Sequence, residues 1–528
     1  MSTNTLSRNG YVLTRSIFGV RRFIRRYALL EQLLPIGVFT LGLVAIFIAN
    51  YLMAATDSAF LIAGGVIGAF LALWIVLRPQ VGLYILAIFT YLNLSDALEV
   101  NFGIPKINQP LIALILVSVL ANRIVLRRKP LVFRGVEATM VFYGVVATMS
   151  VLFAAANQSA ALDRLIDWLK DFAILIIMVQ LCDDEQSFRT VLWALILSAA
   201  LVAGLSWYHT FTGDTQNTFF GLAKSGVHQI VGDLDDVRVT GPLDDPNFYA
   251  QILLMIFPLA AYRMLTGTTQ AGRLLGALCT VLIVGAAIFT YSRGGFLALV
   301  VVTVLLVLDR KYNLLRVALV GAIMVAILIP ILPSGYVSRV MTLSDAVASD
   351  PTMQTEASFR GRTSEMLIAL QMFAENPILG VGKRNYQALY IEYSSVLGLD
   401  PRLESRQAHS LYLELMAEMG TLGILAFSSI LAALFWSTAR ARRQFRALGR
   451  PDLAAWTASL QLGIVSYLTT SIFLHADYAR YMWIMFALAA SASVLSQAMT
   501  ERRNAAQRES SQATLPASDL ARFEEKDS

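Results

Sequence analysis

The chain has 528 residues, of which 56% are hydrophobic and only 15% are charged, and its formal net charge is +6. Soluble domains carry about 25% charged residues, and the apolar residues here fall in runs long enough to cross a bilayer, about 20 residues each. A soluble multidomain protein is therefore excluded. The basic residues lie in short loops between apolar runs, so membrane topology explains the positive charge better than nucleic-acid binding does.

The apolar runs predict an all-α integral membrane protein with about fourteen spanning helices, or twelve to fourteen. The predicted spans are 33–54, 58–77, 80–95, 108–125, 136–156, 164–182, 188–209, 246–265, 272–291, 294–309, 314–332, 409–437, 455–474 and 479–498. A basic segment, 1–32, precedes them. The polar segment 501–528 follows them and is predicted to be disordered.

Loop charge orients the spans. With a cytoplasmic N-terminus, every strongly basic short loop falls on the cytoplasmic side. These loops contain Arg123, Arg127, Arg128, Lys129 and Arg134, then Arg263 and Arg273, then Arg310, Lys311 and Arg316, then Arg440, Arg442, Arg443, Arg446 and Arg450. Both termini are therefore expected in the cytoplasm, and two long loops, about 211–243 and 333–408, are expected outside.

The larger outer loop is predicted to form a small, partly helical cap on the membrane surface. A first helix is predicted to end at Asn376-Pro377, and a second helical pattern spans Tyr386 to Val396. The apolar residues on one face of the first helix are Met366, Leu367, Leu370 and Phe373.

A polar cluster precedes the span at 246–265. Asp245 is a natural N-cap and Pro246 suits the first helical turn, so these residues are interpreted as a helix start. Arg238 lies just before that turn, on the outer side, where positive charge is depleted. The Asp-Leu-Asp pattern at 233–235 has the letters of a cation site, but the pattern is common by chance, and no metal site is predicted.

Two further basic clusters lie on the outer side. Arg293 lies in the tight turn Tyr291-Ser-Arg-Gly-Gly, where the alternative is an arginine that snorkels to the headgroups. Arg360 and Arg362 begin the amphipathic helix of the cap. The run Gly380-Val-Gly-Lys is not a nucleotide loop, because neither a first glycine nor a final Ser or Thr stands at the required spacing.

The last cluster opens the span that begins at His409. Glu414 and Glu418 lie four residues apart, on one helical face inside the apolar zone. Ionisable groups there are costly and are usually functional or paired. A histidine at the junction of a polar loop and such a span is a candidate general base.

Taken in order, these motifs resemble the O-antigen ligase and O-antigen polymerase superfamily. The resemblance extends from Arg238 to Phe427, and the first seven spans match only as a hydrophobic pattern. It rests on Arg238-x-x-Gly-x-x-x-x-Pro-Asn247, Ser292-Arg-Gly294, Arg362 near Asn376-Pro-x-x-Gly-x-Gly382, and His409-Ser-x-Tyr-Leu-x-x-x-x-Glu-x-Gly-x-x-Gly423.

The resemblance implies a glycosyltransferase similar to the GT-C class that works without metal or cofactor at the periplasmic face of the bacterial inner membrane. A glycan on undecaprenyl diphosphate would be moved to a hydroxyl of lipid A core, another glycan or a protein. The family's essential arginine and histidine would be Arg238 and His409. Contacts to diphosphate or glycan would come from Arg293, Arg360, Arg362, Asn247, Tyr412 and Glu414. Met366 stands where relatives often have an aromatic, which departs from the pattern.

The chemistry of the residues fits that activity independently. Arginine binds phosphate bidentately and stays charged, which suits a lipid diphosphate leaving group. The expected organisation is a transmembrane bundle at 33–210, a catalytic region at 211–437 that includes the loop 333–408, and C-terminal spans at 438–500. The main alternative is a transporter or flippase of lipid-linked glycan, for which Glu414 and Glu418 are the best evidence, although no repeated halves are visible. A structural scaffold would explain neither the arginines nor His409.

Overall fold

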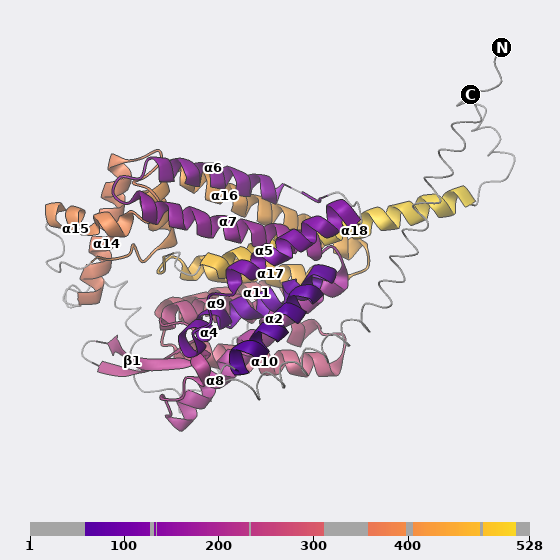
Figure 1. Ribbon diagram of the computed structural model, residues 1–528, viewed down its shortest axis with the longest axis horizontal. Helices are drawn as coiled ribbons and strands as arrows, with labels where there is room; N and C mark the ends of the chain where they lie inside the picture. The colour runs from indigo at the N-terminus through magenta and orange to yellow at the C-terminus, as the bar shows by residue number, and fades with distance from the viewer. Residues whose placement is uncertain are drawn as a thin grey trace, which may run out of the picture. The chain divides into compact units, whose positions relative to one another are not determined.

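The computed structural model describes residues 59–126, 131–133, 135–231, 234–310, 357–397, 405–475 and 479–513 (Figure 1). It divides into two units, residues 1–82 and 83–528. The described part of the first unit consists of α2 (Ala59–Leu77) and the first residues of α3 (Pro79–Tyr91). Because α2 is apolar on all sides, it is suited to burial in protein or lipid.

The second unit is mostly helical. Its helices after α3 are α4 (Leu94–Phe102), α5 (Asn108–Leu120), the π-helical turn η1 (Ala121–Leu126), α6 (Val136–Leu152), α7 (Gln158–Leu181), α8 (Glu185–Thr212), the short 3-10 turn η2 (Phe219–Gly221), α9 (Pro246–Thr266), α10 (Gln270–Phe289), α11 (Arg293–Arg310), α14 (Ala357–Glu375), α15 (Tyr386–Leu397), α16 (Leu411–Ala447), α17 (Pro451–Thr470) and α18 (Ala479–Ala513).

The chain is a helical integral membrane protein. Five of the described helices are long and apolar enough to cross a bilayer, namely α8, α9, α10, α16 and α18, and the pair α3–α4 makes six if it counts as one broken span. Helices are also present at the other predicted spans within the described residues, although these helices are shorter, less apolar or more highly charged. The predicted spans 33–54 and 314–332 lie outside the described residues, so the number fourteen stays a prediction.

Two predicted boundaries differ from the structure. The span at 80–95 is broken, because α3 and α4 meet at an angle of 69°. Asn93 adopts the left-handed conformation between them, φ 51°, which asparagine tolerates better than most residues. At the other end, α18 continues to Ala513, past the predicted start of a disordered tail at 501. The sequence from 501 to 513 contains no Gly or Pro, so a helix can propagate through it.

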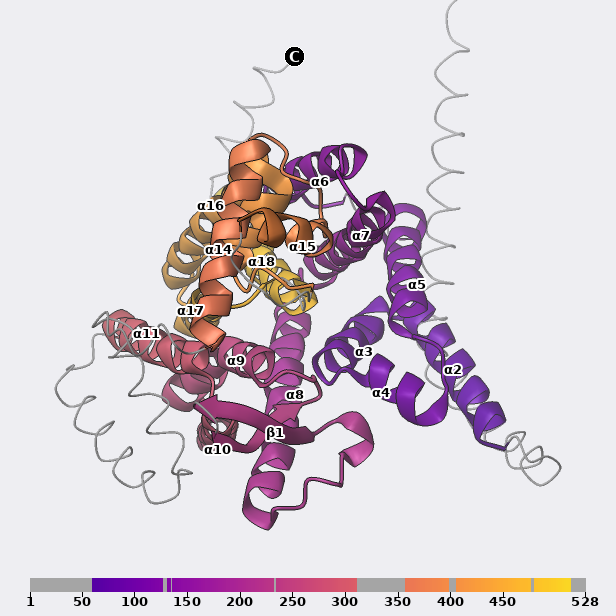
Figure 2. The same ribbon diagram turned by 90° about the vertical axis from the view of Figure 1, so that its left-hand side faces the viewer.

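The fold is not all-α, because the predicted outer loop at 211–243 contains an antiparallel hairpin. Its strands are β1 (Lys224–Val231) and β2 (Leu234–Gly241), paired so that Gly226 lies opposite Arg238. In the sequence a Gly-Asp pair separates the two strands, which is a typical hairpin connection. In Figures 1 and 2, β1 lies toward the same end of the second unit as α14 and α15.

Helix α16 is broken at Gly420, whose φ of 61° and ψ of −159° suit only glycine. The backbone groups freed by the break pair with the segment 377–382, which connects α14 to α15. The amides of Val381 and Gly382 donate to the carbonyls of Ala417 and Glu418, and the amide of Thr421 donates to the carbonyl of Pro377. A Cβ on Gly380 would lie 2.3 Å from the backbone of Glu418. The motif glycines are therefore needed for this close backbone pairing.

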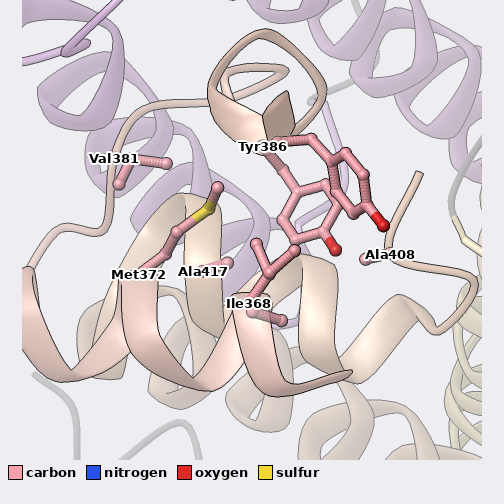
Figure 3. Close-up of a cluster of buried hydrophobic side chains, with 8 residues drawn as sticks. Ile368, Met372, Val381, Tyr386, Ala408 and Ala417 are labelled. Carbon is pink, nitrogen blue, oxygen red and sulfur yellow. The ribbon is translucent and has the colours of Figure 1, made fainter. Parts of the chain in front are cut away.

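The two predicted cap helices are confirmed as α14 and α15, and α14 ends at Glu375, just before Asn376-Pro377. They pack with the start of α16 around a buried apolar cluster (Figure 3). The cluster consists of Ile368, Ala369, Met372, Val381, Tyr386, Tyr390, Ala408 and Ala417.

The apolar face predicted for α14 is not the face that packs on the rest of the protein. Met366, Leu367 and Leu370 are 43%, 40% and 39% exposed, whereas Ile368 and Met372 are fully buried. The buried face also includes Glu365. An apolar count along the helix therefore does not find the residues that face the protein, because a charged residue lies among them.

Candidate functional site

Arg238 lies in β2 and is buried, with 4% of its surface exposed. Its Nε donates to the carbonyl of Thr290 at 2.7 Å, and its Nη2 donates to Oδ1 of Asn247 at 3.3 Å. Burial lowers the pKa of Arg238 to about 10; Asp245 opposes this shift, and Arg293 adds to it. The guanidinium thus stays charged at neutral pH in a place where an anion would be favoured.

Two helix starts flank this arginine. Asp245 caps α9 by accepting from the amides of Asn247 and Phe248 at 2.6 and 3.1 Å, which confirms the predicted N-cap. Arg293 is the first residue of α11 and follows a tight turn in which Tyr291 has a φ of 54°. Helix N-termini carry partial positive charge and attract phosphate. Arg238, Arg293 and Asn247, which we call the arginine group, therefore form a surface suited to an anion.

His409 precedes α16 and adopts the left-handed conformation, with φ 43°. Its side chain is 40% exposed, and Nδ1 lies 3.1 Å from Oε2 of Glu365. Nδ1 also lies 3.0 Å from the carbonyl of Gln407. Acceptors on both sides of Nδ1 favour the tautomer with the proton on that atom, which leaves Nε2 able to accept a proton.

Glu365 is a residue that sequence reasoning missed. It lies on α14 and is only 2% exposed, and Arg406 pairs with its Oε1 at 2.9 Å. The hydroxyl of Tyr386 donates to the backbone carbonyl of Glu365 at 2.8 Å, which fixes this turn of the helix against α15. The helical spacing of Glu365 with Ile368, Ala369 and Met372 was the signal that could have found it.

The segment that follows α17 connects His409 to the arginine group. The ring of His475 lies 5.6 Å from that of His409 and 5.2 Å from that of Phe248, the residue after Asn247. The amide of Leu411 donates to the carbonyls of Ser471 and Leu474. The starts of α9, α11 and α16 therefore meet at one end of the second unit.

The other residues predicted to contact the substrate make contacts elsewhere, or their contacts are not described. Tyr412 donates to the carbonyl of Leu468 at 2.8 Å, which ties α16 to α17, so its contact with substrate stays a prediction. Arg360 and Arg362 lie in the first turns of α14, and their contacts lie outside what the structure describes. Glu414 lines a different feature, a cleft between α6, α7, α16 and α18.

This cleft collects charged and aromatic side chains. Its lining residues are Tyr143, Arg164, Asp167, Trp168, Asp171, Lys383, Leu411, Glu414, Leu415, Glu418, Phe427, Met482 and Trp483. At its buried part, Arg480 donates to Asp171 at 3.1 Å, and Lys383 lies over the ring of Tyr143 at 5.4 Å. Burial acts to lower the pKa of Lys383, but Tyr143 and Glu418 outweigh it, so this pKa lies above its ordinary value.

Among the residues that the structure describes, no three His, Cys, Asp or Glu side chains are close enough to hold a metal ion. Asp233 lies outside the described residues. The prediction that no metal is needed therefore rests on the family resemblance.

These features define a helical membrane protein with a cationic surface and a carboxylate-supported histidine at one end. Residues 278–428 match the family model of O-antigen ligase, which confirms the resemblance seen in the motifs. The matched segment includes Arg293, Glu365 and His409, whereas Arg238 and Asn247 lie before it. A comparison with curated proteins found no match.

Proposed function

We propose that the chain is a glycosyltransferase of the bacterial inner membrane that moves a glycan from undecaprenyl diphosphate to an acceptor hydroxyl at the periplasmic face. The O-antigen ligase domain supports a lipid-linked glycan as substrate. The observation that carries the reaction is the pairing of His409 with buried Glu365, joined through His475 to the arginine group.

In the proposed reaction, the acceptor oxygen attacks the anomeric carbon of the donor sugar. The bond from that carbon to the diphosphate oxygen breaks, and the lipid diphosphate leaves with the electron pair. The acceptor proton passes to Nε2 of His409, and Glu365 stabilises the resulting imidazolium through Nδ1. The energy comes from the lipid diphosphate, which agrees with the absence of a nucleotide loop from the sequence.

Arg238 and Arg293 would bind the diphosphate as its charge grows. A positioned donor aimed at developing charge contributes roughly 3–4 kcal/mol to lowering the barrier. Arg238 is prepared for this role, because Thr290 and Asn247 already fix the plane of its guanidinium. Its binding partner is thus a group with two or more acceptor oxygens, such as a diphosphate.

Loop charge supports a periplasmic location for this end of the protein, with both termini in the cytoplasm. The catalytic region would be 211–437, with its cap in the loop 333–408. The three acceptor classes are lipid A core, another glycan repeat and a protein side chain. Neither the arginine group nor His409 selects among them, since each acceptor presents a hydroxyl to the same base.

The test is a gene disruption in the source bacterium, complemented by the wild-type protein or by His409→Ala. We expect the disruption to remove a surface glycan and to accumulate undecaprenyl-diphosphate-linked glycan at the periplasmic face, with rescue by the wild-type protein only. Accumulation on the cytoplasmic face would favour a flippase instead. Full rescue by folded His409→Ala would remove the proposed base.

A further inference from the structure

The cleft between α6, α7, α16 and α18 contains a buried hydrogen-bond donor that the protein does not satisfy. Trp168 is 7% exposed, and its indole N–H has no acceptor among the described residues. A buried indole N–H normally has a partner, so an unsatisfied one requires an explanation. Because Trp168 lines the cleft, the explanation that fits the position is a ligand oxygen in the cleft.

The other cleft residues have the chemistry that recognises sugars. Tyr143 lies between Trp168 and Trp483, with ring centroids 6.1 and 5.8 Å away, and Trp168 stacks on Phe172. These rings are largely buried against one another, so the polar groups beside them are what a ligand would meet. Glu414 and Asp167 are half-buried carboxylates on the same cleft, and carboxylates accept hydrogen bonds from sugar hydroxyls.

A purely structural network accounts for only part of this arrangement. Asp171 is compensated by Arg480, and Glu418 accepts from the amide of Tyr386 at 3.3 Å. These contacts stabilise the buried end of the cleft. They supply no acceptor for the indole N–H of Trp168.

The position of the cleft indicates which sugar it would bind. Leu411 and Glu414 line it from the first turns of α16, directly after His409. Asn247 and Arg293 of the arginine group lie at the starts of α9 and α11, and Figure 2 shows these helices apart from α6 and α7. A donor diphosphate on the arginine group would therefore leave the cleft to the acceptor.

We propose that this cleft is the acceptor subsite and that it binds a hydroxyl-bearing part of the acceptor glycan, with Trp168 as donor and Glu414 as acceptor of hydrogen bonds. The proposal rests on the transferase function proposed above. The cleft has a volume of about 50 Å³, which is room for a few water-sized groups, since one water needs about 10–15 Å³. It therefore admits one arm of a sugar, while the ring lies over the mouth.

The test uses the full chain in lipid nanodiscs and two conservative variants, Trp168→Phe and Glu414→Gln. The donor is labelled undecaprenyl-diphosphate-linked glycan extracted from the disrupted strain, and the acceptor is the glycolipid fraction of that strain. We expect Trp168→Phe to raise the acceptor KM roughly three- to tenfold, as for one neutral hydrogen bond. Glu414→Gln should raise it roughly tenfold or more, as for a charged one. The donor KM should change in neither variant.

Trp436→Phe is the matched control, because Trp436 is on α16, the helix of Glu414, but is 73% exposed and outside the cleft lining. It should leave both KM values unchanged. If the wild-type protein transfers glycan but Trp168→Phe and Glu414→Gln leave the acceptor KM unchanged, or raise the donor KM equally, the acceptor subsite is refuted while the transferase function stands. A wild-type protein that consumes no donor would overturn both proposals.

Discussion

Replacement of Glu365 by glutamine tests the mechanism most directly. Glutamine keeps the size and shape of the side chain but removes the negative charge 3.1 Å from Nδ1 of His409. We expect this ion-pair contact to tighten into a charge-assisted hydrogen bond in the transition state. Such a bond contributes about 1.5–3 kcal/mol, so losing it there should lower kcat by roughly ten- to 150-fold. The donor KM should stay nearly constant, because the side chain of Glu365 is directed to His409 and Arg406.

The assay is transfer of labelled glycan by the purified chain in nanodiscs, with thermal unfolding measured in parallel. Glu375→Gln is the matched control, since Glu375 is on the same helix but points outward to Gln371 and Tyr393. It should retain wild-type activity. Because Glu365 is also paired with Arg406, some loss of stability is expected from Glu365→Gln, and only kcat of the folded fraction bears on the mechanism.

A double-mutant cycle separates positioning from general structural support. If Glu365 acts only through His409, then Glu365→Gln should add no further loss of activity in a His409→Ala background. Equal losses in both backgrounds would refute the reasoning, as would wild-type kcat in folded Glu365→Gln.

Three further predictions concern Arg238, the need for a metal and the break in α16. Arg238→Lys should lose nearly as much activity as Arg238→Ala, because lysine cannot reproduce the two directed bonds from Nε and Nη2; recovery of most activity by lysine would mean that only charge matters. Transfer should continue in EDTA, and a loss reversed by magnesium or manganese would revive the Asp-Leu-Asp pattern at 233–235. Gly420→Ala should destabilise the protein by at least about 1–3 kcal/mol in chemical or thermal unfolding, because alanine is strained at this conformation and its Cβ would lie 2.5 Å from Ile378. Gly204→Ala, where nothing lies within 4 Å, is its control and should be near neutral.

Sequence reasoning succeeded where a local signal determines the structure. The Asp245-Pro246 start of α9 and the Asn376-Pro377 stop after α14 both came from capping chemistry, which acts within a few residues. The bend at Asn93 was missed because asparagine is also common inside helices, and only its left-handed conformation marks the break. The hairpin was missed because its signal, a Gly-Asp pair between short strands, is weak beside long apolar runs.

The site could be predicted as a set of residues but not as an arrangement. Arg238 and His409 were found from their motifs, yet His475 and Glu365 were not, because their importance lies in contacts with residues far along the chain. Glu365 is also charged, and a search for apolar residues along one face of a helix leaves charged residues out. Its burial is possible because Arg406 offsets its charge, a pairing that no local pattern reveals.

The break in α16 explains why the cap and the histidine belong to one rigid arrangement. A helix interrupted within a membrane span must find other partners for its freed backbone groups, and here the segment 377–382 provides them. That segment connects α14 to α15, so the same hydrogen bonds that repair α16 also anchor the helix that carries Glu365. His409 lies at the start of α16, two residues before the helix begins. The carboxylate of Glu365 and the imidazole of His409 are therefore both positioned by α16. Such anchoring can hold a base within the few tenths of an ångström that catalysis requires.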